Sequence, residues 1–406
     1  MSLTDADPRR WRTLVLVSVA MMLSLSAWMT ATALGPELQQ RWGLTASQVG
    51  WLTTVVQLGF VAGTAVGALL NLADVLSSRA YFATSALLAA AANALLLVVP
   101  GYGLALAARF ATGFFLAGVY PPGMKMISTW FRSARGFAIG TVVGALTVGK
   151  ATPYLLKAFG GPTVTAVVAG ASIAGLAAAV LMAVGYRDGP YPFPRRAFEW
   201  TRVARLLRHR PTMLATGGYL GHMWELYAMW TWVPAFLVAA AGAGVSQPAI
   251  DLVAFGAIAA GGLGCVWGGV AADKVGRPRV VNFAMTVSGV CCVVAGFAFD
   301  GPFVLLALLT WVWGFFVVAD SAQFSAMVTE VAPPDSVGTA LMLQTSAGFL
   351  LTMVTIQAVP AMVEVVEWRW AFAFLALGPV VGIMSILRLV RVQPSPTHRT
   401  DRCSIS

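Results

Sequence analysis

The chain contains about twelve apolar runs that are each long enough to cross a lipid bilayer as a helix. They lie at roughly 13–34, 49–70, 80–100, 104–126, 136–158, 162–185, 212–240, 248–271, 279–299, 302–328, 337–360 and 369–390. The hydrocarbon core of a bilayer is about 30 Å thick, so a spanning helix needs about 20 mainly apolar residues. Short turns rich in glycine, proline or charge separate the runs. The sequence therefore predicts an all-α membrane protein with twelve transmembrane helices.

Composition supports a surface that faces lipid. Of the 406 residues, 58% are hydrophobic and only 10% are charged, and the mean hydropathy is +0.79. A soluble domain carries about 25% charged residues, so this chain has too few polar groups to cover a water-facing surface. The first run lacks a clear cleavage site, and we expect a retained helix rather than a signal peptide. The four cysteines have no metal-site spacing, so neither a metal centre nor a disulfide framework is expected.

An internal repeat divides the chain. One connection is long, proline-rich and arginine-rich, which predicts an N-terminal six-helix bundle (1–185), a basic cytoplasmic linker (186–211), a C-terminal six-helix bundle (212–392) and a cytoplasmic tail (393–406). Gly67 and Gly269 are 202 positions apart, and the Gly-Phe-Phe sequences that begin at Gly113 and Gly314 are 201 apart. The sequence thus predicts two pseudo-symmetric bundles.

Basic residues gather on one side of the predicted membrane. If the chain starts inside, only Arg41, Lys157 and Arg369 fall on the outer side, while Arg109 and Lys150 fall within spans. Cytoplasmic loops of membrane proteins carry an excess of Lys and Arg. We therefore expect both termini in the cytoplasm and the protein in the inner (plasma) membrane of a bacterium. The net charge of +10 then reflects topology and contact with anionic membrane lipids, and nucleic acid is not an expected partner.

A charged turn between two spans carries the most specific motif. Its pattern is G-x3-D-[KR]-x-G-[RK]-x-[RK], and its residues are Gly269, Asp273, Lys274, Gly276, Arg277 and Arg279. The pattern resembles the cytoplasmic loop motif of the major facilitator superfamily of transporters. That resemblance implies two six-helix bundles working by alternating access, a small-molecule solute, a functional monomer, and a charge network that latches the outward-facing state. The alternative is a positive-inside turn that contains an aspartate.

The matching turn of the first half departs from the pattern. Asn71 stands where the second half has Asp273, and the basic run is missing. The latch of the first half is therefore lost, or its carboxylate has moved to Asp74.

Two cations lie inside predicted spans. Arg109 precedes Gly113 in an Arg-x3-Gly pattern that resembles a motif associated with proton coupling in the superfamily. Lys150 lies between Gly149 and Pro153 in a stretch that weakly resembles the helix 5 motif of antiporters, where only small residues are usual. A buried ammonium suits an anionic substrate or a carboxylate partner. The alternative for each cation is a side chain that extends to the outer interface.

The seventh run holds polar residues at helical spacing. His222, Glu225 and Met229 fall on one helical face. A membrane glutamate beside a titratable histidine suits proton carriage, and Glu225 is the main candidate for coupling. The alternative is a structural pair that ties this helix to a neighbour. Trp224 and Tyr227 are candidates for lining a substrate cavity, although most aromatic residues here are expected to pack or to lie in the interfacial belt.

The tenth run contains Asp320, a candidate for substrate binding and proton coupling. The repeat aligns it close to Val119-Tyr120, and we expect it to pair with Lys125, with Arg109 or with a substrate cation. Tyr120 begins a Tyr-Pro-Pro-Gly sequence that interrupts the fourth run, which suits a gating hinge and a substrate contact. Glu330 is interpreted as an exposed residue at the end of its helix.

No catalytic or nucleotide-binding pattern is present, so the sequence predicts no enzyme, no cofactor and no direct use of ATP. An ion gradient remains as the energy source. We predict a secondary transporter that moves a small carboxylate-type or inorganic anion by proton-coupled alternating access. The runs 109–153 and 37–57 resemble in texture the nitrate, cyanate and organic-anion porters. Those porters carry an arginine in helices 2 and 8, which is missing here, so nitrate itself is not expected.

Two alternatives remain open. A proton-antiport exporter of apolar or cationic compounds is favoured by Glu225, Asp320 and the aromatic seventh run. Uptake of a metal or metal chelate would use His222, Met223 and Met229, although no two of the three histidines are close in sequence. A membrane receptor or membrane enzyme would need an added site that the sequence does not show.

Overall fold

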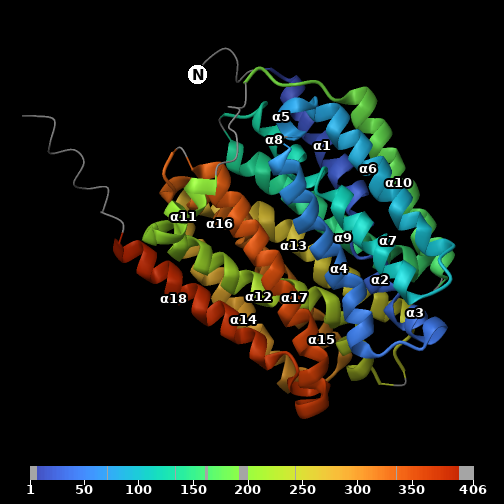
Figure 1. Ribbon diagram of the computed structural model, residues 1–406. Helices are drawn as coiled ribbons and strands as arrows, with labels where there is room; N and C mark the ends of the chain where they lie inside the picture. Colours follow the sequence, from blue (N-terminus) through green and yellow to red (C-terminus); the bar gives the residue numbers. More distant parts are fainter. Residues whose placement is uncertain are drawn as a thin grey trace, which may run out of the picture.

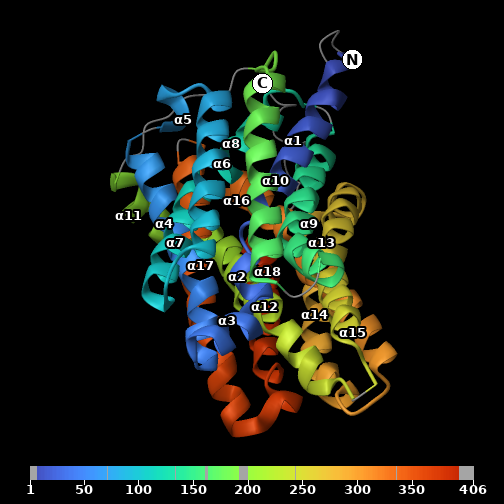
Figure 2. The same cartoon turned by 90° about the vertical axis from the view of Figure 1, so that its right-hand side faces the viewer.

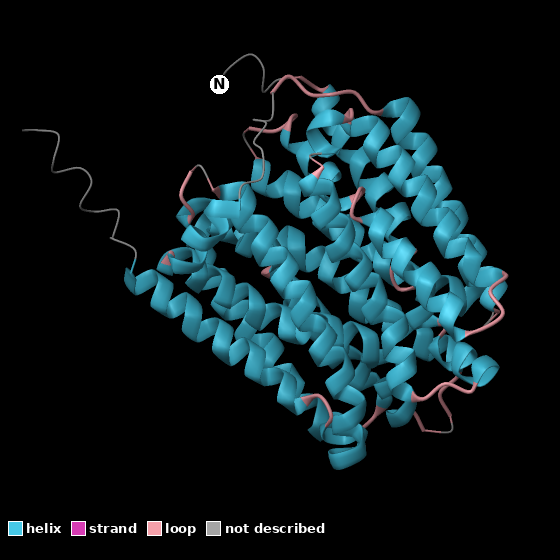
Figure 3. Cartoon of the chain, in the orientation of Figure 1, coloured by secondary structure: helices cyan, strands magenta, loops and turns pink. Residues whose placement is uncertain are grey.

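The computed structural model describes residues 7–70, 72–132, 134–160, 163–191, 200–242, 244–334 and 336–392, and these residues form helices and connecting turns without a strand (Figure 3). The N-terminal helices are α1 (Arg9–Leu25), α2 (Thr30–Ala33), α3 (Gly35–Trp42), α4 (Ala46–Leu69), α5 (Leu72–Val75), α6 (Ser78–Ala94), η2 (Leu95–Leu97), α7 (Tyr102–Leu116), α8 (Tyr120–Ser128), α9 (Arg135–Gly160) and α10 (Val164–Gly185). The C-terminal helices are α11 (Trp200–Arg208), α12 (Arg210–Ala240), α13 (Gln247–Val275), α14 (Arg277–Ala298), α15 (Phe303–Ala319), α16 (Ser321–Val331), α17 (Val337–Trp370), η3 (Ala373–Ala376) and α18 (Leu377–Val392). The all-α prediction is confirmed.

Ten helical segments within the described residues are long and apolar enough to cross a membrane. The predicted spans 13–34 and 212–240 are the two that are not among them. The first folds as α1 and α2 with an interruption between them. The second is the continuous helix α12, whose glycine, histidine, glutamate, tyrosine and tryptophan residues lower its mean hydropathy. The first is therefore excluded by its interruption and the second by its lower hydropathy.

Helices α1–α10 form the N-terminal half and α11–α18 the C-terminal half. In Figure 1, α6 and α10 lie on one flank and α14 and α18 on the other, while α9 and α13 lie next to each other between them. Helices α5, α8, α11 and α16 lie along the upper left edge of the molecule in Figure 1, and α3 lies at the lower right; in the turned view α5 and α8 again lie above α3 (Figure 2). Following the predicted topology, we call these the inner end and the outer end.

Backbone contacts reproduce the internal repeat at a single offset. Gly63 lies against the carbonyl oxygen of Phe114, where α4 crosses α7. The equivalent crossing of α13 and α15 places Gly264 against the carbonyl oxygen of Phe315, and both members are 201 positions further along. Glycine lets the two backbones approach because no Cβ separates them. The two halves therefore share one packing plan.

Three of the spans are broken near their own midpoints. α1 ends at Leu25 and α2 begins at Thr30, while α7 and α15 are followed after short breaks by α8 and α16. Val119 and Asp320 precede the first residues of α8 and α16, and they are 201 positions apart. The alignment of Asp320 with Val119-Tyr120 is thus confirmed. Such breaks expose backbone groups in the protein interior, where only other protein groups can satisfy them.

The halves meet along two helix pairs. α9 and α13 approach through small residues, and Gly144 lies against the carbonyl oxygen of Gly262. α4 and α17 meet through polar side chains in their outer parts: Ser47 Oγ donates to Gln357 Oε1 at 2.8 Å, and Gln357 Nε2 donates to Thr54 Oγ1 at 3.3 Å. The α9–α13 interface therefore depends on close backbone approach, and the outer part of the α4–α17 interface depends on side-chain hydrogen bonds.

Candidate functional site

A buried lysine lies where the two halves meet. Lys150, on α9, is 5% exposed, and its ammonium donates a hydrogen bond to the hydroxyl of Tyr227 on α12. Lys150 Nζ also lies 4.3 Å from the ring centroid of Trp28, 4.9 Å from that of Tyr227 and 5.3 Å from that of Trp230. Three aromatic faces therefore surround the ammonium, and we call this arrangement the Lys150 cage. The lysine does not extend to the outer interface.

Aromatic rings continue outward from the cage in both halves. Phe349, on α17, lies 5.7 Å from Trp28 and 5.4 Å from Tyr227 between ring centroids. Phe60, on α4, lies 4.9 Å from Phe349 and 6.3 Å from Tyr120. Tyr120 is thus near the cage but separated from Trp28 by the ring of Phe60, and no direct contact joins it to Lys150.

No carboxylate pairs with Lys150 among the residues that the structure describes. A buried charge normally requires an opposite charge or several hydrogen bonds, because removal from water is costly. Aromatic faces attract a cation through their negative quadrupole and compensate part of that cost. The cage thus holds a cation that is shielded but not neutralised.

Arg109 supports the segment that carries Trp28. The side chain is fully buried, and its guanidinium donates to the carbonyl oxygens of Ala27 (2.9 Å) and Trp28 and to Asn93 Oδ1 (3.0 Å). These carbonyls belong to the break between α1 and α2, where they lack helical donors. The side chain therefore points inward, as expected, but its partners are backbone carbonyls and an amide rather than a carboxylate.

Asp320 pairs with a histidine. His222 Nδ1 lies 2.9 Å from Asp320 Oδ1, and His222 Nε2 lies 2.9 Å from Ser321 Oγ. Both members of the pair are buried. The expected pairing of Asp320 with Lys125 or Arg109 is therefore wrong. Sequence spacing could not show this contact, since 98 positions separate the two residues and the break before α16 orients the aspartate.

Glu225 is held inside the C-terminal half. Its carboxylate accepts hydrogen bonds from Ser288 Oγ (3.0 Å), Cys292 Sγ (3.3 Å) and Trp313 Nε1. These donors lie on α14 and α15. His222 and Glu225 lie on the same helix but have separate partners on neighbouring helices. The residues missed by sequence reasoning are the donors, because their contact with Glu225 depends on helix packing.

Trp224 lies away from the cage. Its indole nitrogen donates to the carbonyl oxygen of Phe374 at 3.4 Å, and the two rings are 6.1 Å apart. This places Trp224 against η3, within the C-terminal half, so it is a packing residue in this structure. Among the predicted binding residues of α12, Tyr227 contacts Lys150 and Trp224 does not.

A sequence profile described as Major Facilitator Superfamily matches residues 16–268 and 219–402 of the chain. The chain belongs to the major facilitator superfamily. It is therefore a multi-pass membrane protein of a family of secondary transporters. The chain is also 31% identical over 152 residues to puromycin resistance protein pur8 of Streptomyces alboniger. That alignment covers 37% of this chain and 30% of the relative.

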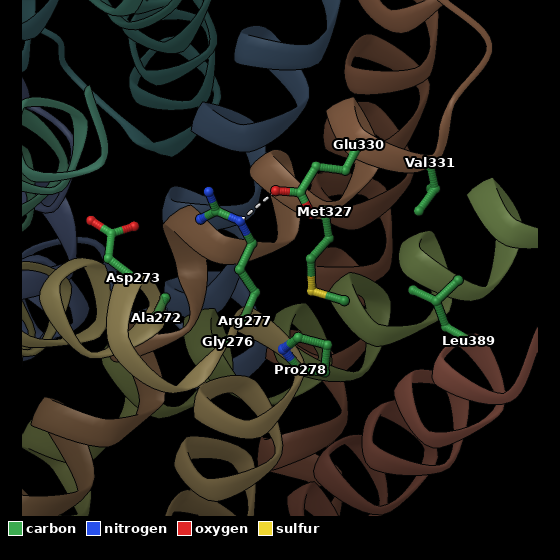
Figure 4. A pocket seen from close by; sticks show the side chains of 9 residues that line it. All are labelled: Ala272, Asp273, Gly276, Arg277, Pro278, Met327, Glu330, Val331 and Leu389. Carbon is green, nitrogen blue, oxygen red and sulfur yellow. Dashed lines mark hydrogen bonds and ion pairs between the residues drawn. The ribbon is translucent and has the colours of Figure 1, made fainter. Parts of the chain in front are cut away.

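The superfamily's loop motif forms its ion pair inside the C-terminal half. Arg277 Nε lies 2.7 Å from Glu330 Oε1, and Arg277 Nη1 donates to Gln323 Oε1 at 2.6 Å. Figure 4 shows this pair and shows Asp273 pointing away from it. Arg277 thus links the inner ends of α14 and α16, as expected of a charge network across two helix ends. The acid is Glu330, which is exposed as expected and in addition pairs with Arg277.

Asp273 faces the other half instead. Its carboxylate oxygens lie close to Gly136 in the first turn of α9, where a Cβ added to that glycine would be 3.5 Å from Oδ2. A helix N-terminus attracts negative charge. Gly269 lies one turn before Asp273 and faces the Gly136 carbonyl, and Gly276 has φ +89°, which allows the turn into α14. The motif therefore touches both halves through different residues.

The other predicted latch residues have no described role in the network. Lys274 and Arg279 are exposed. Asn71 and the side chain of Asp74 lie outside the described part of the chain. A cleft of about 380 Å³ at the inner end is lined by the motif and neighbouring residues, namely Ala272, Asp273, Gly276, Arg277, Pro278, Met327, Glu330, Val331 and Leu389 (Figure 4).

A buried ionic triad connects the halves at the outer end. Lys157 Nζ lies 2.9 Å from Glu37 Oε1 and 3.8 Å from Asp251 Oδ1, and it donates to the Ala33 carbonyl oxygen at 3.2 Å. Gln247 also donates to Asp251, at 3.1 Å. Sequence reasoning placed Lys157 on the outer side but did not find its partners, because they come from segments more than 90 positions away on either side. Among the described residues, no three His, Cys, Asp or Glu side chains are grouped so as to hold a metal ion.

Proposed function

We propose that this superfamily member moves a small organic anion by proton-coupled alternating access, with the anion bound at Lys150. The observation that carries the proposal is the Lys150 cage: a buried ammonium between the halves, with aromatic faces and one hydroxyl around it. An ammonium without a carboxylate partner attracts an anion and repels a cation. Because the cage uses residues of both halves, the affinity for an anion would depend on how the two halves are placed relative to each other.

Proton coupling is assigned to the C-terminal half. Glu225 and the His222–Asp320 pair are buried acids and a histidine in the membrane interior. Ser288, Cys292 and Trp313 donate to Glu225 and stabilise its carboxylate, and the His222–Asp320 pair can hold a proton between its two members. An anion at Lys150 and a proton at one of these sites would cross together with little net charge, which lowers the cost of moving both through a low-dielectric interior.

Purified protein in proteoliposomes with an imposed pH gradient tests the function. Uptake of radiolabelled organic anions should follow an inwardly directed proton gradient and should be lost in Lys150→Ala. Arg41→Gln is the matched control, because Arg41 is an exposed cation of the same half at the outer end. If no anion moves under either gradient polarity, or if Lys150→Ala transports as well as the wild type, the proposal is wrong.

A second candidate is export of apolar or cationic compounds in exchange for protons. Its support is the likeness to the puromycin resistance protein over 152 residues and the ring cluster around Trp28 and Phe349. Lys150 opposes it, since a cationic substrate would meet an unneutralised ammonium. Inverted vesicles incubated with external puromycin distinguish the two functions: proton-driven puromycin accumulation without anion transport would favour the exporter. Metal uptake has no supporting ligand group among the described residues.

A further inference from the structure

The Lys150 cage contains hydrogen-bond donors that lack acceptors. The indole nitrogens of Trp28 and Trp230 are buried and have no hydrogen-bond partner. Both side chains are at most 2% exposed, so water does not reach them. Buried polar groups are normally satisfied, and an unpaired N–H in an apolar interior is unfavourable. Together with Lys150, these two residues give the cage three donors that an oxygen-rich anionic group would satisfy.

The cage has a single cation. Arg109, a buried cation that contacts the carbonyl oxygen of Trp28, already uses both of its terminal nitrogens on Ala27, Trp28 and Asn93. A second carboxylate on the substrate would therefore be buried without a positive partner, which is costly. The charge of the site thus favours a monoanion over a dianion.

The remaining surface beside the donors is aromatic. Trp28 and Phe60 come from the N-terminal half, and Tyr227 and Phe349 from the C-terminal half, with centroids of contacting rings 4.9 to 6.0 Å apart. When the halves part, rings of one half lose their contacts with rings of the other. A planar aromatic body can replace these contacts through stacked or edge-to-face geometry. A short aliphatic acid would leave most of the faces uncovered.

We infer that the substrate is an aromatic monocarboxylate, with its carboxylate on Lys150 and the indole N–H groups of Trp28 and Trp230 and its ring among Trp28, Phe60, Tyr227 and Phe349. The inference rests on the proposed function and specifies the substrate class of the same site. The cage would then select its substrate in two independent ways. The lysine charge and the N–H donors would select the carboxylate, and the ring contacts would select the aromatic ring of the substrate.

Binding of small probes to the purified full-length protein in nanodiscs tests the inference. Isothermal titration compares benzoate with acetate, which lacks the ring, with phthalate, which has a second carboxylate, and with benzamide and benzylamine, which lack the negative charge. Benzoate should bind about tenfold or more tightly than each of the others. Lys150→Gln should weaken benzoate binding about tenfold or more, and Lys150→Arg should restore part of it.

A second variant tests the indole N–H group of Trp28 separately from its aromatic ring. Trp28→Phe keeps an aromatic face and removes the N–H group, so benzoate binding should weaken severalfold while the protein remains folded. Trp224→Phe is the matched control, because Trp224 lies outside the cage, and it should bind benzoate as the wild type does. Unchanged binding in Trp28→Phe would remove the indole donor from the site.

The outcomes distinguish a failure of the substrate class from a failure of the proposed anion transport. If acetate binds as tightly as benzoate and both depend on Lys150, the anion site stands and the aromatic class is overturned. If phthalate binds more tightly than benzoate, the monoanion is overturned. If no carboxylate binding depends on Lys150, or if benzylamine binds best, the proposed function itself fails.

Discussion

The two halves bury charges of opposite sign. Among the described residues, the buried cations Arg109, Lys150 and Lys157 all belong to the N-terminal half. The buried acids Glu225, Asp251 and Asp320 all belong to the C-terminal half, which holds the buried histidine as well. Two halves that share one packing plan have thus acquired different electrostatic roles. The repeat determines where helices cross, and individual substitutions determine what each half can bind.

The partners of these charges explain the division further. Arg109 donates to two backbone carbonyls and to Asn93 within its own half, and Glu225 and Asp320 also have their partners within their own half. Lys150 and Lys157 instead contact the opposite half, Lys150 through Tyr227 and Lys157 through Asp251. Under the proposed alternating access, these two are the described buried cations whose surroundings would change when the halves move apart. In that proposal they would link substrate binding and outer closure to conformation.

We expect the largest effect, on proton-driven transport, from neutralising Glu225, the main candidate for proton coupling in the C-terminal half. Glu225→Gln keeps the shape of the side chain and an oxygen that accepts from Ser288, but it cannot carry a proton. We expect proton-driven anion accumulation in proteoliposomes to be abolished, while exchange of anion for anion continues. Glu330→Gln is the control, since this acid is exposed at the inner end. Accumulation at the wild-type level would remove Glu225 from coupling.

The next largest effect is expected on stability, when Arg109 is replaced. Arg109→Met leaves the carbonyl oxygens of Ala27 and Trp28 without donors, and we expect the free energy of unfolding to fall by about 3 kcal/mol. Arg109→Lys should recover part of the loss because one donor remains available. Denaturant unfolding in detergent measures both variants. A stable Arg109→Met protein that has lost only proton coupling would instead support the coupling role implied by the superfamily motif.

The outer triad predicts a smaller change in conformational balance. Lys157→Met removes the cation between Glu37 and Asp251, so the outer ends of the halves should part more often. Labelling of Thr54→Cys, which is buried where α4 meets α17, by a membrane-impermeant maleimide should increase severalfold in a protein without native cysteines. Asp251→Asn should increase it less, because Lys157 keeps its 2.9 Å contact with Glu37. Equal labelling in all three proteins would show that the triad does not hold the outer end closed.

The smallest effects are expected at the inner turn. The Arg277–Glu330 pair is half exposed, and Glu330→Gln should change stability by less than about 1 kcal/mol. Asp273→Asn removes a charge beside the first turn of α9, where such contacts contribute about 0.3–1 kcal/mol. It should therefore shift the inward–outward balance, followed by labelling at both ends, more than Glu330→Gln or Asn71→Ala does. The reverse order would place the latch on Glu330 rather than Asp273.

Sequence reasoning found the helices and the repeat but only part of the site. The Gly-Phe-Phe repeat predicted the alignment of Asp320 with the break before Tyr120, and apolar length predicted nearly all spans. Lys150, Glu225 and Asp320 were identified because an ionisable residue inside a span is rare and costly. Their partners were not identified correctly, since His222, Ser288 and Trp313 are brought near them by helix packing at sequence separations of 63 or more.

The charged turn at Gly269–Arg279 likewise shows which features follow from the sequence and which require the tertiary structure. Its residues alone indicated the superfamily, but only the packed inner end shows that Arg277 binds Glu330 while Asp273 faces α9. The sequence by itself determined the membrane environment and the helical architecture, because these depend on local hydropathy and residue identity. The tertiary structure decided which charges are buried, which of them pair with an opposite charge and which have only neutral partners. That choice depends on contacts of a few ångströms between distant segments, which periodicity and spacing do not encode.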